Sequence, residues 1–225
     1  YEKSDHLGGT FISASKASFK GKLRGLEAWY EHVVNEMGIE IHLNNEIKDI
    51  SSLNADAYVI ATGSKPKRFN IEGSEKAIDA IDYLNGKEVG ETVAVIGGGL
   101  TGCEIAYELY LQGKKPLIVE MKDDLIAQRG VCLANSSYLR DFFKLHKIPT
   151  YLEAKLSSIG ENEIVIEKKG EKSLKLPVDS VIMSIGYNPD PLTKKGKNTY
   201  LVGDCLAIGN LRTVIWRAYE VAMKI

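Results

Sequence analysis

The residues in this sequence most suited to a binding chemistry are three glycines and an acid at fixed spacing. Gly97, Gly99 and Gly102 follow the apolar run 92–96, and Glu120 ends the next apolar run. Glycines at this spacing permit a tight turn, the approach of a pyrophosphate to the backbone, and close helix packing. An acid about 20 residues further on accepts hydrogen bonds from a ribose. The pattern predicts a dinucleotide site, and the alternative is a glycine turn that serves only packing.

The surrounding residues predict the elements that such a site requires. Residues 92–96 are short, apolar and β-branched, as in a buried parallel strand. Residues 100–112 have apolar side chains at helical spacing, Gly113 marks the end of that helix, and 116–119 form a second apolar strand. The helix N-terminus offers unpaired N–H groups and the positive end of its dipole to phosphates.

The loop and the acid together predict which nucleotide binds. A carboxylate at Glu120 would repel a 2′-phosphate, so we expect NADH to be favoured over NADPH. Lys122 lies near enough in sequence to soften this preference. The candidate NAD(H) residues in this stretch are Gly97, Gly98, Gly99, Leu100, Thr101, Gly102 and Glu120.

Composition limits the other classes of function. The chain has 225 residues, enough for one large or two small domains, with 44% hydrophobic and 26% charged residues. Lys and Arg number 29 against 30 Asp and Glu, so the charge indicates neither nucleic acid nor a membrane surface as a partner. No apolar run approaches the roughly 20 residues of a membrane span, and no secretory signal is visible. We expect a small-molecule nucleotide as partner and a cytoplasmic location.

The cysteines and histidines predict no metal or disulfide chemistry. Cys103, Cys132 and Cys205 are scattered, with no C-x-x-C pair, which argues against a disulfide framework, a zinc site and a dithiol redox centre. The four histidines lie far apart in sequence. We therefore predict no metal site.

Periodicity predicts the remaining elements. Residues 23–37 form an amphipathic pattern typical of a helix. Further helices are expected at 78–84, 133–146 and 213–225, and strands at 39–43, 148–152 and 181–185. Residues 47–53 are expected to form a strand and a turn, and 56–63 a strand that runs into a Thr-Gly turn. Residues 155–176 are expected to form antiparallel strands with turns at 160–162 and 170–171, and 10–20 to be irregular.

The beginning of the sequence leads to a separate expectation. The chain starts at Tyr1 without a methionine, and Tyr1-Glu2-Lys3 looks like the end of a strand. We expect a piece of a longer protein in which a second nucleotide site is divided. Taken alone, Glu2 is better interpreted as a chance acid in an irregular terminus.

Several motifs occur together in the order of a known family. Glu2 with Gly8-Gly9, Ala61-Thr62-Gly63, the Gly97–Gly102 loop, Val181–Gly186 and Gly203-Asp204 resemble motifs of flavin-dependent pyridine nucleotide oxidoreductases. The stretch 14–26 is most similar to the C-terminal half of the old-yellow-enzyme-like NADH:flavin oxidoreductases. That group includes 2,4-dienoyl-CoA reductase, 2-enoate reductase and trimethylamine dehydrogenase. The resemblance spans nearly the whole chain.

The resemblance implies an α/β fold with two Rossmann-like three-layer domains. A discontinuous and incomplete FAD domain would comprise 1–86 and 183–225, and an inserted NAD(H) domain would comprise 87–182. The residues that the resemblance assigns to FAD are Glu2, Gly9, Arg24, Ile47, Ala61, Thr62, Gly63, Gly203 and Asp204. It adds Glu104, matching an acid that contacts the nicotinamide carboxamide, and Gly186 to the NAD(H) side.

The implied activity is the transfer of a hydride from NADH to FAD. The resemblance places an FMN and an iron–sulfur cluster in an N-terminal barrel outside this chain, which would reduce an enoate-type substrate and could carry a homo-oligomer contact. No catalytic residue is assigned, because hydride transfer requires no acid–base group from the protein. Since the first glycine-rich FAD loop is absent, we expect this chain alone to bind FAD weakly or not at all and to be inactive. The alternative is a non-redox module that binds an adenine nucleotide.

Overall fold

The computed structural model of the protein describes residues 1–128 and 130–225. The chain forms two compact units: the first comprises 1–12, 25–67 and 187–225, and the second comprises 13–24 and 68–186. The divisions fall inside helices α1 (Thr10–Ser15) and α2 (Gly21–Glu36), so both helices contribute residues to each unit. The second unit contains the whole of the expected insert 87–182 and extends beyond it at both ends.

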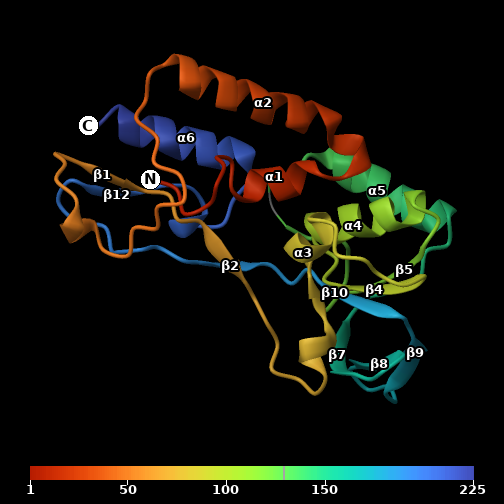
Figure 1. Ribbon diagram of the computed structural model, residues 1–225. Helices are drawn as coiled ribbons and strands as arrows, with labels where there is room; N and C mark the ends of the chain where they lie inside the picture. Colours follow the sequence, from red (N-terminus) through yellow and green to blue (C-terminus); the bar gives the residue numbers. More distant parts are fainter. Residues whose placement is uncertain (129) are drawn as a thin grey trace. The chain divides into compact units, whose positions relative to one another are not determined.

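The second unit is built on a parallel sheet with the strand order β3-β10-β4-β5-β6. Its central strands β10, β4 and β5 are labelled in Figure 1. Its strands are β3 (Ile78–Asp79), β10 (Ser180–Met183), β4 (Thr92–Ile96), β5 (Lys115–Val119) and β6 (Thr150–Tyr151). The strands expected at 92–96, 116–119, 148–152 and 181–185 are therefore confirmed, with shifts at their ends. The start of the helix expected at 78–84 is instead the edge strand β3.

Alternate residues of the central strands enter two separate cores. Val93 and Val95 of β4 pack with the helices, in a cluster that includes Ile105, Leu109 and Phe143. Ala94 and Ile96 point to the opposite face of the sheet, into a cluster with side chains of the antiparallel strands. Because successive strand residues face opposite sides, this buried five-residue strand holds three layers together.

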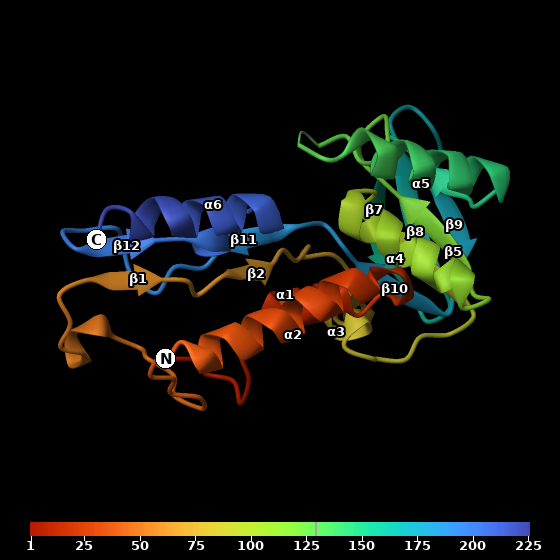
Figure 2. The same ribbon diagram turned by 90° about the horizontal axis from the view of Figure 1, so that it is seen from above.

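Helices cover one face of this sheet and an antiparallel sheet covers the other, as Figure 1 shows from the side. Figure 2 looks onto the helix layer, with the strands behind it. The helices are α3 (Ala80–Leu84), α4 (Leu100–Leu111) and α5 (Leu133–Leu145). The opposite layer is β7 (Ala154–Ile159), β8 (Glu163–Lys168) and β9 (Leu174–Pro177), paired in sequence order. The expected helices at 100–112 and 133–146 and the expected antiparallel strands are confirmed.

The first unit contains two short strand pairs and two long helices. β1 (Tyr58–Ile60) pairs in parallel with β12 (Thr199–Leu201), and β2 (Ser64–Pro66) pairs antiparallel with β11 (Tyr187–Pro189). Helix α6 (Leu211–Ala222) begins with a capping box formed by Asn210 and Thr213. Helices α2 and α6 confirm the helices expected at 23–37 and 213–225.

Three predictions for the first 53 residues are wrong. Residues 39–43 form no strand: the N–H of Glu2 donates to His42 O and that of Asn44 to Ser4 O, at 2.9 and 2.8 Å, without a regular ladder. The strand expected within the strand-and-turn segment 47–53 does not form; residues 50–52 form a 3₁₀ helix, because the Asp49 side chain accepts from Ser51 N and favours a local turn. Residues 10–15, expected to be irregular, form α1.

Candidate functional site

The glycine loop joins β4 to α4 and has two positions where the fold itself requires glycine. Gly97 has φ of +107°, and a Cβ there would lie 2.3 Å from the Ser184 carbonyl oxygen. A Cβ on Gly102 would lie 1.9 Å from the Gly97 carbonyl oxygen. Both distances are far below contact, so these two glycines allow the loop, α4 and the end of β10 to pack together.

Gly99 differs from both, because the protein itself leaves room at this position. Its φ is −69°, and the nearest atom to a Cβ added there would be Gln128 Oε1 at 3.2 Å. Gly99 is the N-cap of α4, and no side chain caps this end. The first N–H groups of a helix have no partner within the helix, and here they belong to Leu100, Thr101 and Gly102. An uncapped helix start behind an open glycine fits a pyrophosphate.

Glu120 follows β5 and contacts the glycine loop directly. Its Oε2 accepts from Gly98 N at 2.5 Å, and its Oε1 accepts from Lys122 N at 2.8 Å. A carboxylate has about four lone-pair sites, so two such bonds leave acceptor capacity for ribose hydroxyls. The expected ribose acceptor therefore also holds the loop, a second role that the sequence pattern did not indicate.

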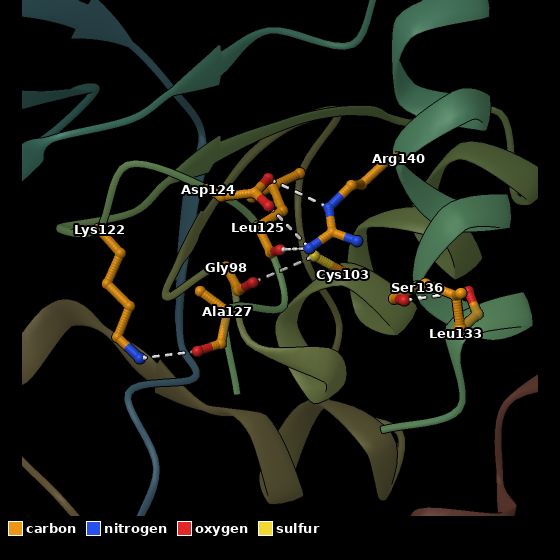
Figure 3. A network of polar contacts seen from close by, with 9 residues as sticks. All are labelled: Gly98, Cys103, Lys122, Asp124, Leu125, Ala127, Leu133, Ser136 and Arg140. Carbon is orange, nitrogen blue, oxygen red and sulfur yellow. Dashed lines mark hydrogen bonds and ion pairs between the residues drawn. The ribbon is translucent and has the colours of Figure 1, made fainter. Parts of the chain in front are cut away.

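The segment 121–128 folds back over Gly98 and is held by α5. Figure 3 shows Arg140 of α5 reaching Asp124 and Leu125: its Nε and Nη2 donate to the two carboxylate oxygens at 3.1 and 2.8 Å, and Nη2 also donates to Leu125 O at 2.5 Å. Ile126 N donates to Gly98 O at 2.7 Å, and Cys103 Sγ donates to the same oxygen at 3.4 Å. Burial raises the pKa of Cys103 to about 12, and nearby Glu120 adds to the shift. The thiol therefore stays protonated and remains a donor.

Glu104 lies one turn into α4 and forms an ion pair with Lys20. Lys20 Nζ is 2.6 Å from Glu104 Oε2, and each side chain is only 18% exposed. Lys20 lies 84 residues earlier in the chain. No periodicity connects residues so far apart, so the sequence reasoning identified Glu104 but missed its partner.

Gly186 follows β10 and has φ of +91° with nothing within 4 Å of a Cβ. Since Ser184 N donates to Ile96 O at 2.7 Å, this turn leaves the sheet beside the end of β4. The structure thus brings Gly97, Gly102 and the turn preceding Gly186 to the carboxyl end of the parallel sheet. Ligands of open α/β sheets bind at this end.

Most candidate FAD residues lie in the first unit, and four of them meet at one sheet end. Ile60 pairs with Leu201 in the parallel β1–β12 ladder, so the next residues, Thr62 and Gly63 on one strand and Gly203 and Asp204 on the other, leave the sheet at the same end. Thr62 Oγ1 donates to Asp190 O at 2.7 Å, and Asp204 Oδ1 accepts from Gly209 N at 3.0 Å. Ala61 precedes Thr62 and is exposed.

The other candidate FAD residues are held locally. Glu2 Oε1 accepts from Ser4 N and Ser4 Oγ at 2.8 and 2.5 Å; burial raises the pKa of Glu2, but these bonds outweigh it and lower the pKa. Gly9 has φ of +50°, and Ile47 is half-buried. Arg24 belongs to the second unit, where its Nη1 donates to the carbonyls of Ser15 and Ala17 at 2.7 and 2.9 Å. Arg24 thus supports the connecting segment 15–17.

Two features are absent from the described part of the chain. Across 1–128 and 130–225, no three or more His, Cys, Asp or Glu side chains are grouped so that they could hold a metal ion. In the same residues, no helix combines the length and the apolar character needed to cross a membrane.

The chain is similar to known proteins over its whole length. The chain is 38% identical over 237 aligned residues to cinnamate reductase of Clostridium sporogenes and 29% identical over 240 to NADH oxidase of Thermoanaerobacter brockii. Each alignment covers 100% of this chain but only 35% and 37% of the relative, so the chain spans about a third of their length. The structure of 2-naphthoyl-CoA reductase in complex with 2-naphthoyl-CoA matches with a TM-score of 0.88 and 26% identity, over 100% of this chain and 35% of that one.

The comparison with family models identifies the family of this chain. The family described as pyridine nucleotide-disulphide oxidoreductase matches residues 48–213, a range that includes the glycine loop, Glu120 and Gly203-Asp204. The predicted α/β fold of the FAD/NAD-binding type is confirmed. The chain belongs to the pyridine nucleotide-disulphide oxidoreductase family, a family of enzymes.

Proposed function

We propose that this chain is the NADH-binding and FAD-binding part of a reductase, with NAD(H) held by the domain at 87–182 and FAD by 1–86 and 183–225. When both cofactors are bound, N5 of the flavin would accept a hydride from C4 of the nicotinamide, which would oxidise NADH and reduce FAD by two electrons. The protein binds and orients the two cofactors. The cinnamate reductase and NADH oxidase relatives support this direction of electron flow.

The observation that carries the proposal is the uncapped start of α4 behind Gly99. The first N–H groups of this helix have no side-chain cap. The packing of the protein does not require a glycine at position 99, so the missing Cβ leaves room for a ligand. Glu120, at the end of the adjacent strand β5, has acceptor capacity for the ribose. Lys20 holds Glu104 on α4, which in the proposed role orients the nicotinamide carboxamide.

The substrate proposal concerns the longer protein. We propose that the electrons pass from FAD to an FMN and an iron–sulfur cluster in a preceding barrel and then reduce an enoate-type substrate in the cytoplasm. The support is the name of the 38% identical relative, cinnamate reductase, together with the resemblance of 14–26 to the enoate reductase group.

Isothermal titration calorimetry of the 225-residue chain with NADH tests the proposed binding. We expect one site per chain, and we expect Gly99→Val to abolish binding with only a small decrease in the melting temperature. Binding that is absent from the unmodified chain, or unaffected by Gly99→Val, would reject the proposal. Anaerobic addition of NADH to the full-length protein loaded with FAD should then remove the oxidised-flavin absorbance.

A further inference from the structure

The segment 121–128 packs against the glycine loop at Gly98. A Cβ on Gly98 would lie 2.5 Å from Leu125 Cδ2 and 3.0 Å from Glu120 Cβ, so this segment packs directly against the loop. Leu125 and Ile126 are 5% and 3% exposed. These two side chains therefore belong to the packed core, whereas the other residues of the segment are exposed and no helix or strand contains it.

The conformation of this segment carries a local cost. Ile126 has φ of +51°, in the left-handed region that β-branched residues rarely adopt. Such residues persist only where their surroundings hold them in place. In that conformation Ile126 N donates to Gly98 O at 2.7 Å, so the strained residue and the glycine loop are directly bonded.

Arg140 supplies the restraint from α5. Its guanidinium bonds both carboxylate oxygens of Asp124 and the Leu125 carbonyl, the two residues that precede Ile126 (Figure 3). This planar, forked geometry is one that a lysine does not reproduce. The Gly98 peptide is in turn bonded on both sides, by Glu120 at its N–H and by Ile126 and Cys103 at its oxygen.

We propose that Arg140 is a positioning residue for the dinucleotide: through Asp124 and the Leu125 carbonyl it fixes the segment 121–128, and this segment fixes Gly98 and Gly99 against the pyrophosphate. This inference rests on the proposed NADH binding. Arg140 acts first at the phosphates, because the backbone of Glu120 is held separately: its N–H donates to Tyr151 O at 2.8 Å and its carbonyl accepts from Ala154 N at 2.9 Å.

The test compares ligands with and without a pyrophosphate. NADH and ADP-ribose are titrated by calorimetry and adenosine by NMR, using the unmodified chain, Arg140→Met, Arg140→Lys and Asp124→Asn. We expect Arg140→Met to weaken NADH and ADP-ribose by about tenfold, equal to ~1.4 kcal/mol, and to leave adenosine within about twofold. Arg140→Lys and Asp124→Asn should weaken NADH and ADP-ribose by less than Arg140→Met does. These two variants keep the test informative if Arg140→Met folds poorly.

The control is Lys175→Met, which removes a 2.6 Å ion pair with Glu163 in the antiparallel layer of the same unit. It should leave all three affinities unchanged. As a ligand-independent measure, the Ile126 amide should exchange faster in Arg140→Met than in the unmodified chain. If Arg140→Met binds NADH as tightly as the unmodified chain, or loses equal affinity for adenosine and NADH, the proposed role of Arg140 is wrong, but the proposed function stands. An unmodified chain that does not bind NADH would instead overturn the proposed function, and this inference with it.

Discussion

At the residue scale, the three glycines of the motif do different work. Gly97 and Gly102 are required by the protein's own packing, with contacts of 2.3 and 1.9 Å to backbone oxygens if a Cβ were added. Gly99 has an ordinary φ and faces open space apart from Gln128. Substitutions at these positions therefore separate folding from binding.

The first prediction compares Gly99→Val with Gly102→Val. Gly99→Val should abolish NADH binding with little change in the free energy of unfolding. Gly102→Val should lower that free energy by more than about 2 kcal/mol, because the new side chain overlaps the Gly97 carbonyl. Urea unfolding of each variant, beside NADH titration, measures both effects. Equal destabilisation by the two substitutions would contradict this division of roles.

The second prediction concerns the choice of nucleotide. We expect the unmodified chain to bind NADH more tightly than NADPH, and Glu120→Arg to narrow or reverse the difference. Since Glu120 also accepts from Gly98 N, Glu120→Arg should weaken both nucleotides. Glu120→Gln is the matched control, because it keeps an acceptor for Gly98 N but removes the charge. We expect it to prefer NADH over NADPH less strongly than the unmodified chain does, and to bind both nucleotides more tightly than Glu120→Arg. Fluorescence titration of both nucleotides decides this, and tighter NADPH binding to the unmodified chain would refute it.

The third prediction is a dependence of stability on alkaline pH. Burial raises the pKa of Cys103 from 9.0 to about 12. The unfolded thiol therefore loses its proton before the folded one does, so this contribution is complete below pH 9.0 and is lost as pH rises towards about 12. The slope is ~1.4 kcal/mol per pH unit within this window. Urea unfolding between these limits should show a shallower decline in Cys103→Ala; parallel curves would count against it.

At the scale of elements, the start of α4 is the point where separate parts of the chain meet. β4 leads into it, Glu120 at the end of β5 bonds its loop, α5 holds the segment 121–128, and Lys20 reaches Glu104 on its first turns. Each element has its own local reason to form, but the site depends on their contacts. The cluster of aromatic side chains between α4 and α5, including Tyr107 and Phe142 with ring centroids 4.7 Å apart, supports this arrangement.

The fourth prediction tests the contact between 13–24 and α4. Lys20→Met and Glu104→Gln should each lower the free energy of unfolding, and the double variant should lower it by less than their sum. We expect a coupling of about 1 kcal/mol, since the charges are mostly shielded from solvent but not fully buried. A double-mutant cycle by urea unfolding gives this quantity, and additive effects would show that the pair contributes nothing.

At the scale of the whole molecule, burial is distributed unevenly between the two units. The central strands of the second unit include Val93, Val95 and Ile118, each 0% exposed. Helices α2 and α6 contain no fully buried residue, and Trp29 and Trp216 are 54% and 60% exposed. The resistance of the backbone to local opening should follow this difference.

The fifth prediction is a pattern of hydrogen exchange. Amides of β4 and β5 should exchange most slowly, near the rate set by global unfolding, and amides of α2 and α6 should exchange much faster. Mass spectrometry of exchanged peptides measures this. Equal protection of β4 and α6 would argue against the burial pattern.

The sequence by itself determined the local parts of this protein. It predicted β4, α4, β5, α5 and the antiparallel strands, as well as the glycine loop and its acid, because each depends on residue spacing within one short segment. The family match then confirmed the fold class. Predictions failed where a strand would have needed a distant partner: residues 39–43 bond irregularly to residues 2–4, and the Asp49 side chain favours a local turn at 50–52.

Only the tertiary structure decided how the glycine loop is held. The Lys20–Glu104 pair joins residues 84 positions apart, Arg140 reaches across to Asp124 and the Leu125 carbonyl, and Glu120 bonds the Gly98 N–H. None of these contacts leaves a period in the sequence, because each forms only after separate strands and helices have packed. The nucleotide motif is therefore local in sequence, whereas its rigidity belongs to the folded second unit.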